Sequence, residues 1–226
     1  AIVEKELAQP ATTAELKVAG NQLVTADGKP VWLQGLCLDS MEWGAGENIL
    51  WSTHVALNDW HANVIRLPVY DKFWFGQAYK GTPAGNPERY REAVDQAVKL
   101  CAAHGAYLVL DLHAFGAPMP EHVVFWKDAA ERYKNNPAVL FELFNEPHDI
   151  SWKVWRDGGD LSADKAQHDD KAVVENTQKN SGQISVGMQA LVDAVRSTGA
   201  RNIVIAGGIG WSYDLSGLLH GFALEE

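Results

Sequence analysis

Short apolar runs alternate with amphipathic segments along most of the chain. Five runs predict strands, because each is brief, rich in β-branched or aromatic residues and bounded by turn residues. These runs are residues 31–38, 63–69, 106–113, 138–146 and 202–207. Four segments with apolar residues at helical spacing predict helices. They span residues 47–60, 87–104, 120–133 and 185–198. Apolar strands that alternate with helices predict a parallel sheet with helical crossovers.

The remaining segments have weaker patterns. Residues 1–15 form a lead-in for which we expect little order, and turn residues within 16–33 predict a small hairpin that plugs one end of a barrel. The long polar stretch 151–182 predicts a surface loop with short helical pieces. We expect residues 215–226 to begin another helix or loop. The chain is therefore divided into the lead-in and one α/β domain, residues 16–226.

Two architectures fit this alternation, an open doubly wound sheet and a (β/α)8 barrel. The sequence after the first predicted strand, GLCLDSMEWG, is not the GxGxxG loop of a nucleotide-binding sheet. Polar or aromatic residues instead follow or end four different strands, at Arg66, His113, Glu146 and Trp211. Sites assembled from several strand ends are typical of barrels. We therefore predict an α/β fold, a (β/α)8 TIM barrel of which this chain supplies about the first five βα units.

Glu146 is the residue that the pattern singles out most clearly. It ends the apolar run AVLFELF, and Pro147 behind it lacks an N–H group and predicts the end of the strand. A carboxyl group at the mouth of an apolar barrel is suited to donate a proton near neutral pH. Asn145 beside it can hydrogen-bond a substrate hydroxyl. The alternative is a strand-end turn without a chemical role.

Composition narrows the classes of partner. The net charge of −10 argues against nucleic acid and anionic membranes, and no apolar run approaches the length of a membrane span. Nine Trp residues suit stacking on sugar rings, although many must be core residues. We take Trp43, Trp74 and Trp211, each in a predicted loop after a strand, as candidate sugar platforms. Packing beneath a loop is the alternative role of each.

Other chemistries find little support. Cys37 and Cys101 are expected to be buried free thiols, and no CxxC or HExxH motif indicates a metal, so we expect no metal or other cofactor. A Schiff-base lyase would need Lys at a strand end, and a serine hydrolase would need GxSxG; neither is present. The start, AIVEKELAQP, fits a mature N-terminus after signal removal or an arbitrary boundary. We expect a secreted or periplasmic protein.

Four segments, NVIRLPV, VLDLH, LFNEPH and NIVIAGGIGWSYDL, together and in this order resemble glycoside hydrolase family five, a large group of retaining β-glycanases that includes many cellulases. The resemblance makes Glu146 the general acid/base and Asn145 the partner of the sugar's 2-hydroxyl. It makes Arg66 a positioner of the second catalytic carboxylate, His113 a substrate-binding residue and Trp211 a subsite wall. A structural ion pair is the plainer role for Arg66, and hydrogen bonding beside the site is the plainer role for His113.

The resemblance implies a second catalytic carboxylate, because retaining glycosidases use two that lie about 5 Å apart. In the family this nucleophile ends the seventh strand, and Glu225 and Glu226 here follow no apolar strand. We expect a complementary C-terminal polypeptide to supply the remaining strands and the nucleophile. The resemblance thus implies a retaining, endo-β-1,4-glucanase-like hydrolase of β-glucan or a related polysaccharide. The alternative is a carbohydrate-binding pseudoenzyme or an inactive barrel fragment.

Overall fold

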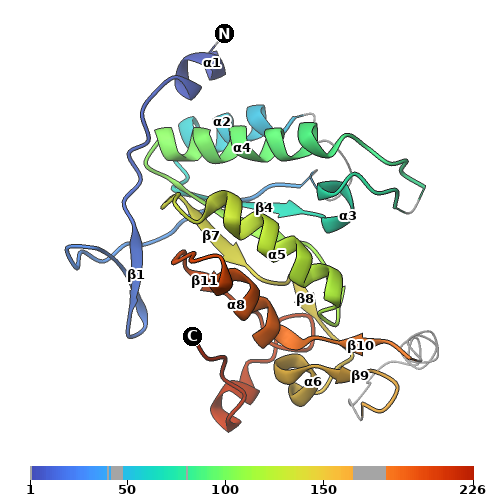
Figure 1. Cartoon of the computed structure of the whole chain (residues 1–226). Coiled ribbons are helices and arrows are strands. Elements are labelled where there is room, and N and C mark those ends of the chain that lie inside the picture. The colour runs from blue at the N-terminus through green and yellow to red at the C-terminus, as the bar shows by residue number, and fades with distance from the viewer. Residues whose placement is uncertain (1, 40, 42–47, 80, 165–181) are drawn as a thin grey trace. The chain divides into compact units, whose positions relative to one another are not determined.

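The computed structural model describes residues 2–39, 41, 48–79, 81–164 and 182–226 (Figure 1). Two compact units make up the chain: Ala1–Leu112 with Tyr133–Phe141, and His113–Arg132 with Glu142–Glu226. From the N-terminus to residue 112 the elements are α1 (Ile2–Leu7), β1 (Leu16–Ala19), β2 (Gln22–Thr25), β3 (Gly35–Cys37), α2 (Ile49–Asn58), β4 (Val64–Val69), α3 (Asp71–Trp74), α4 (Pro87–Ala103) and β5 (Tyr107–Leu112). The elements that follow are β6 (Phe115–Gly116), α5 (Pro120–Tyr133), β7 (Val139–Glu142), β8 (Glu146–Pro147), α6 (Trp152–Asp157), β9 (Gly159–Asp160), β10 (Ile184–Ser185), α8 (Gly187–Ser197), β11 (Val204–Ile205) and the 3-10 helix η1 (Ser216–His220).

Five strands form one parallel sheet in the order β11-β7-β5-β4-β3. Backbone hydrogen bonds extend the ladder past the strand ends: the Leu108 N–H donates to the Ala138 carbonyl at 2.7 Å, and the Leu143 N–H donates to the Ile205 carbonyl at 2.9 Å. The strands are separated along the chain by helices, as crossovers between parallel strands require. The predicted α/β class is confirmed.

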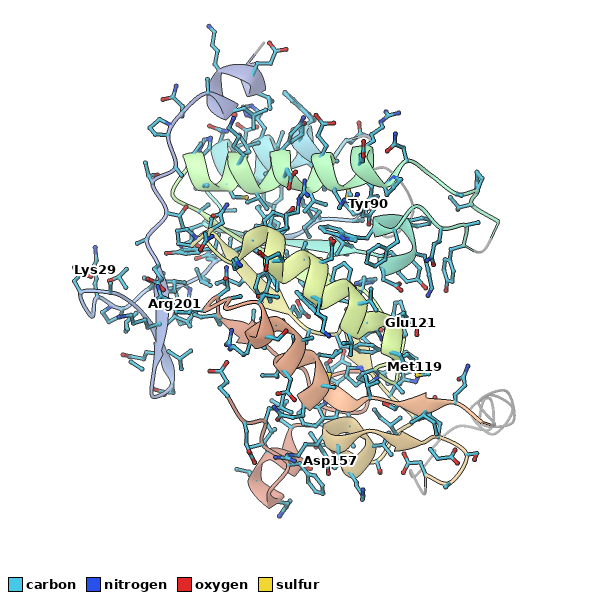
Figure 2. All side chains as sticks on the ribbon, in the orientation of Figure 1. Lys29, Tyr90, Met119, Glu121, Asp157 and Arg201 are labelled. Carbon is cyan, nitrogen blue, oxygen red and sulfur yellow. The ribbon has the colours of Figure 1, made fainter. Side chains whose placement is uncertain are left out.

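The core of the first unit lies between its strands and helices. Ile65, Leu67 and Val69 of β4 are fully buried, and every residue of β5 is buried. Helix α4 packs with α2 and α3 and against β5 (Figure 1). Tyr90 of α4 (Figure 2) donates its hydroxyl hydrogen to the Met41 carbonyl and accepts from the Tyr70 N–H at 2.9 Å. A buried apolar sheet beneath a helical layer is the arrangement that the apolar strands predict.

Local chemistry explains where the helices begin and end. The Asn86 side chain accepts from the N–H groups of Glu88 and Arg89 at 2.9 and 3.1 Å, and Pro87 occupies the first turn of α4. Gly105, just past the end of α4, has φ +67°, a value that glycine adopts without a Cβ clash. The helix predicted at residues 87–104 is confirmed, and the one predicted at 120–133 coincides with α5.

The lead-in is more ordered than its sequence predicts. Residues 2–7 form α1, and the Glu6 carboxylate accepts from Asn58 Nδ2 at 3.1 Å and lies 2.8 Å from His54 Nδ1. His104 Nε2 lies 3.6 Å from Oε1 of the same carboxylate, the oxygen that accepts from Asn58. The expectation of little order in residues 1–15 is therefore wrong, because polar contacts with α2 and α4 replace the apolar pattern that the lead-in lacks. The predicted hairpin is confirmed as β1 and β2.

Several strands differ from prediction at their ends. Pro68 lies inside β4 instead of closing it, and the Leu38 N–H donates to the Arg66 carbonyl at 2.9 Å. The backbone groups of Arg66 and the other even-numbered residues of β4 therefore face β3. Because β3 ends at Cys37, before the position that would pair with Pro68, the missing N–H of Pro68 breaks no bond between these two strands. The strand predicted at residues 138–146 divides into β7 and β8. Between them, side chains bind two backbone carbonyls: Trp126 Nε1 donates to that of Leu143 at 2.9 Å, and the Ser212 hydroxyl donates to that of Asn145 at 2.8 Å. The predicted first and fifth strands shorten to β3 and β11.

The described part of the polar stretch contains a helix, as predicted. Ser151 caps α6 by accepting from the Val154 N–H at 3.3 Å, and Trp155 on its inner face is 1 % exposed. β9 then pairs antiparallel with β10, and the Ser185 hydroxyl donates to the Pro118 carbonyl at 2.8 Å. The rest of this prediction, residues 165–181, lies outside the described residues.

Candidate active site

Strand β8 carries Glu146 and is fixed on one side by β6. Phe115 lies opposite Glu146 in this parallel pair, and the Glu146 N–H donates to the Ala114 carbonyl at 3.2 Å. One step further on, the His148 N–H donates to the Gly116 carbonyl at 3.1 Å. The pairing therefore brings Glu146 beside the segment that follows β5, which begins at the predicted substrate-binding residue His113.

The turn after β11 fixes the other side of the same segment. The Trp211 N–H donates to the Pro147 carbonyl at 3.0 Å, and the Ser212 hydroxyl donates to the Asn145 carbonyl at 2.8 Å. A separate hydrogen bond fixes the start of the turn: Trp155 Nε1 donates to the Gly207 carbonyl at 3.0 Å. The Asn145-Glu146-Pro147 backbone is thus held from two directions, which favours a fixed position for the carboxyl group.

This turn has a left-handed backbone. Gly210, Trp211 and Ser212 have φ values of +61°, +61° and +64°, between Ile209 and Asp214, which form an antiparallel bridge. Only the first of the three is a glycine, and the left-handed region costs other residues about 1–2 kcal/mol each. Such strain persists only where the surroundings hold it, and it is concentrated at functional sites. The hydrogen bonds to the Asn145-Glu146-Pro147 segment supply that support.

Two further glycines make room for the turn. A Cβ atom on Gly207 would lie 2.2 Å from the Ser212 hydroxyl oxygen, and one on Gly208 would lie 1.8 Å from the Asp214 carbonyl oxygen. Both distances are far below van der Waals contact. The Gly-Gly pair therefore permits the close approach that brings the Ser212 hydroxyl to the Asn145 carbonyl.

An aromatic stack lies beside the carboxyl-bearing segment. The His148 imidazole and the Trp211 indole have centroids 3.6 Å apart and planes inclined by 13°. His148 Nδ1 is 2.9 Å from the Asp149 carboxylate, which orients the ring. On the β6 side, His113 meets Phe115 edge to face with centroids 5.2 Å apart. Trp211 is 48 % exposed, so part of its ring can contact a ligand.

The second unit therefore unites four predicted site residues: His113, Asn145, Glu146 and Trp211. Asn145 is 8 % exposed, whereas Glu146 and His113 are partly exposed. A carboxyl group open to solvent beside an aromatic surface can exchange a proton with a ligand that lies on that surface. The roles that the resemblance gives these residues stay predictions, but their common placement follows from the two sets of backbone contacts.

Arg66 belongs to the first unit and lies in the first half of β4, not near its carboxyl end. Its Nη2 lies 2.9 Å from Asp111 Oδ2, and the Asp111 side chain is fully buried. Its Nη1 donates to Cys37 Sγ at 3.5 Å. The structural ion pair, which the sequence analysis gave as the alternative role of Arg66, is therefore present. The second role, positioning a catalytic carboxylate, stays a prediction.

The prediction for Trp74 is wrong. Trp74 is fully buried in α3 and packs edge to face on Tyr90, with centroids 6.5 Å apart, so neither ring face can receive a sugar. The sequence favoured a loop because glycines and prolines follow this residue. Trp43, the third candidate platform, lies outside the described residues.

The two cysteines behave differently. Cys101 is buried, and burial raises the pKa of its thiol to about 12. Cys37 is exposed, so the expectation that both thiols are buried is wrong for this residue; it lies at the end of the short strand β3, where the described residues leave it open to solvent. Within the described residues, no cluster of three His, Cys, Asp or Glu side chains could hold a metal ion. No described helix is long and apolar enough to cross a bilayer.

Sequence reasoning missed three contributors to the site: His148, Asp149 and Ser212. His148 stood inside the recognised segment LFNEPH, and Ser212 stood inside NIVIAGGIGWSYDL, but neither was given a role. The glycine pair before the turn was the available signal, because adjacent glycines indicate close backbone approach. Which side chains would meet there depends on the left-handed turn.

A parallel sheet whose strands alternate with helices, with a partly exposed carboxyl group on the short strand β8, fits the class of β/α-barrel proteins, whose sites lie at strand ends. The family model Cellulase (glycosyl hydrolase family 5) matches residues 24–220. The chain belongs to this family. The predicted (β/α)8 barrel is thereby confirmed as the fold to which the chain contributes five strands.

Curated relatives agree with the family. Endoglucanase A of Butyrivibrio fibrisolvens is 31% identical over 145 residues, which are 61% of this chain and 33% of that protein. An endoglucanase of Clostridium saccharobutylicum is 26% identical over 216 residues, 92% of this chain and 41% of that protein. The matched part of the chain thus covers 33% and 41% of the length of these two relatives.

Solved structures agree on the fold. The β-glucanase SdGluc5_26A of Saccharophagus degradans has a TM-score of 0.66 and 23% identity, over 95% of this chain and 60% of that one. The catalytic domain of Thermobifida fusca endoglucanase Cel5A has a TM-score of 0.60 and 22% identity, over 92% of this chain and 57% of that one. At such identity the likeness shows the fold alone.

Proposed function

We propose that the protein containing this chain is a retaining, endo-β-1,4-glucanase-like glycoside hydrolase in which Glu146 is the general acid/base. The observation that carries the proposal is the position of Glu146. The carboxyl-bearing segment is fixed between β6 and the turn after β11, and both flanks present aromatic side chains. Membership of glycosyl hydrolase family 5 supports the reaction class.

The proposed mechanism has two steps. Glu146 donates its proton to the glycosidic oxygen while a second carboxylate attacks the anomeric carbon, so the bond to the leaving sugar breaks and a glycosyl-enzyme ester forms. Glu146, now a carboxylate, then takes a proton from water, and the resulting attack on the anomeric carbon releases the sugar and the second carboxylate. We propose that this second carboxylate ends a later strand of the same barrel, outside residues 1–226.

A β-glucan or related polysaccharide is the proposed substrate. The curated relatives are named endoglucanases, and the Saccharophagus degradans β-glucanase has been solved in complex with cellotetraose. The partly exposed indole of Trp211 offers an apolar surface for the flat face of a sugar ring. A polymer of this kind cannot cross a membrane intact, which supports a secreted or periplasmic location.

The test compares Glu146→Gln with Glu121→Gln in the intact protein. Gln keeps the shape of the side chain but cannot donate a carboxyl proton, so hydrolysis should fall by about a hundredfold or more. Glu121 lies exposed at the start of α5 (Figure 2), and its variant should retain activity. Release of reducing sugar from carboxymethyl cellulose measures turnover, and calorimetric titration with cellotetraose measures binding.

Three results separate the alternatives. Loss of turnover with retained binding in Glu146→Gln supports the proposal. Turnover within twofold of the unmodified protein removes Glu146 from the mechanism. Cellotetraose binding with no turnover even in the unmodified protein supports a carbohydrate-binding pseudoenzyme instead.

A further inference from the structure

We infer that His148 is a positioning residue for Trp211, holding one face of the indole so that the opposite face is presented to a sugar ring beside Glu146. The inference rests on the proposed function and concerns the same site. The His148 imidazole and the Trp211 indole form a parallel stack, with ring centroids 3.6 Å apart and an interplanar angle of 13°. A stack this close leaves no space for a ligand between the rings.

His148 is itself held at two points. Its N–H donates to the Gly116 carbonyl at 3.1 Å, which fixes the backbone to β6. Its Nδ1 lies 2.9 Å from an oxygen of the Asp149 carboxylate, and Asp149 has φ +59°, which turns the chain at that point. The imidazole is therefore a supported surface against which the indole can rest.

Trp211 has its backbone fixed independently of its ring. The Trp211 N–H donates to the Pro147 carbonyl at 3.0 Å, and the Ser212 hydroxyl donates to the Asn145 carbonyl at 2.8 Å. These bonds fix the start of the side chain but leave rotation about its own bonds open. The stack on His148 selects one orientation of the ring, and Trp211 as a whole residue is still 48 % exposed.

The geometry also relates the aromatic surface to the acid. His148 follows Glu146 by two residues, and the carbonyls that hold the turn belong to Asn145 and Pro147, the two neighbours of Glu146. The exposed indole face and the carboxyl group are therefore parts of one hydrogen-bonded unit. A sugar stacked on that face is bound beside the proton donor, and it keeps this contact in the ground state and the transition state alike, so the contact contributes to affinity.

The test measures cellotetraose affinity in the intact protein with Glu146→Gln, so that binding is read without turnover. The series is His148→Ala, His148→Phe, Trp211→Ala and the double variant His148→Ala/Trp211→Ala. His148→Ala should weaken binding by about twofold to tenfold, as expected for loss of an aromatic pair. His148→Phe, which can still stack, should bind within twofold of the parent.

The double variant distinguishes positioning from an independent contact. It should bind no more weakly than Trp211→Ala, because His148 acts through the indole. With Glu146 restored, His148→Ala should raise KM and leave kcat within twofold. His220→Ala, at an exposed histidine of η1, is the matched control and should leave affinity unchanged.

The outcomes against the inference are equally definite. Unchanged affinity in a folded His148→Ala protein, losses that multiply in the double variant, or failure of His148→Phe to restore binding would each overturn it. Absence of cellotetraose binding in the parent would overturn it as well. Unimpaired hydrolysis by the Glu146→Gln protein would instead overturn the proposed function, and the KM values of the same His148 and Trp211 variants would then test the inference in place of the titrations.

Discussion

The ion pair between Arg66 and Asp111 gives the most direct test of the packing inside the first unit. Arg66 lies opposite Val109 in the β4–β5 register, so Asp111 is its diagonal neighbour on the same face of the sheet. The guanidinium Nη2 is 2.9 Å from Asp111 Oδ2. The Arg66 side chain is 26% exposed, whereas Asp111 is fully buried, so the carboxylate depends on protein groups for its stabilisation.

The magnitude follows from this asymmetry. At 2.9 Å and an effective dielectric constant of about 20, the attraction is roughly 6 kcal/mol, and desolvation of Asp111 cancels part of it. Arg66→Met retains an apolar stem and leaves a buried carboxylate without the guanidinium, so it should cost about 3–5 kcal/mol. Arg66→Met combined with Asp111→Leu removes both charges and should be less destabilised than Arg66→Met alone.

Urea unfolding followed by circular dichroism measures these differences. Arg89→Met, at an exposed position of α4, is the matched control and should change the free energy of unfolding by less than about 0.5 kcal/mol. A cost below about 1 kcal/mol for Arg66→Met, or a double variant as unstable as the sum of its single changes, would refute the reasoning. Activity per folded molecule is a separate readout: a loss there supports the predicted role of Arg66 in positioning the second carboxylate.

Three other predictions concern thiols, the N-terminal helix and the glycine pair. At pH 8 an aromatic disulfide reagent should react with Cys37 but not with Cys101, whose raised pKa of about 12 keeps it a thiol. In urea, where the chain is unfolded, the reagent should react with both cysteines. Because the folded pKa is the higher one, Cys101 should also lower stability as pH rises above about 8.5, where only the unfolded chain loses this proton. Glu6→Ala removes the polar contacts of α1 with His54 and Asn58 of α2 and with His104 just after α4, so hydrogen exchange in α1 should accelerate while that in α4 does not. Gly208→Ala places a Cβ atom against backbone, so it should lower both the thermal unfolding midpoint and cellotetraose affinity, whereas Gly85→Ala, in open space, should change neither.

Helices were predictable because their ends are set by nearby residues. The Asn86-Pro87 start of α4 and the glycine after it are local signals, and they place the helix within one residue. Strand ends were less predictable because a strand extends only as far as its partner. β3 and β11 are shorter than their apolar runs, and Glu142 ends β7 although the apolar run continues.

The candidate site was predictable to the extent that its residues stand in recognisable segments. Asn145 and Glu146 followed from one segment, and His113, just before β6, and Trp211, in the turn, followed from two others. The burial of Trp74 did not, because it depends on Tyr90, which arrives from a different helix. The stack of His148 on Trp211 depends on a left-handed turn that two residues other than glycine adopt, against their usual preference.

That strained turn and the segment carrying the acid support each other. The turn retains its left-handed backbone because Asn145 and Pro147 accept its hydrogen bonds, and those same bonds fix the backbone around Glu146. Neither part has its observed position without the other, so the effects of variants in the two parts should not add independently. A substitution such as Gly208→Ala is therefore expected to act on binding and on proton transfer together, whereas His148→Ala, which leaves those hydrogen bonds in place, acts on binding alone. This difference separates a residue that builds the site from one that orients a surface within it.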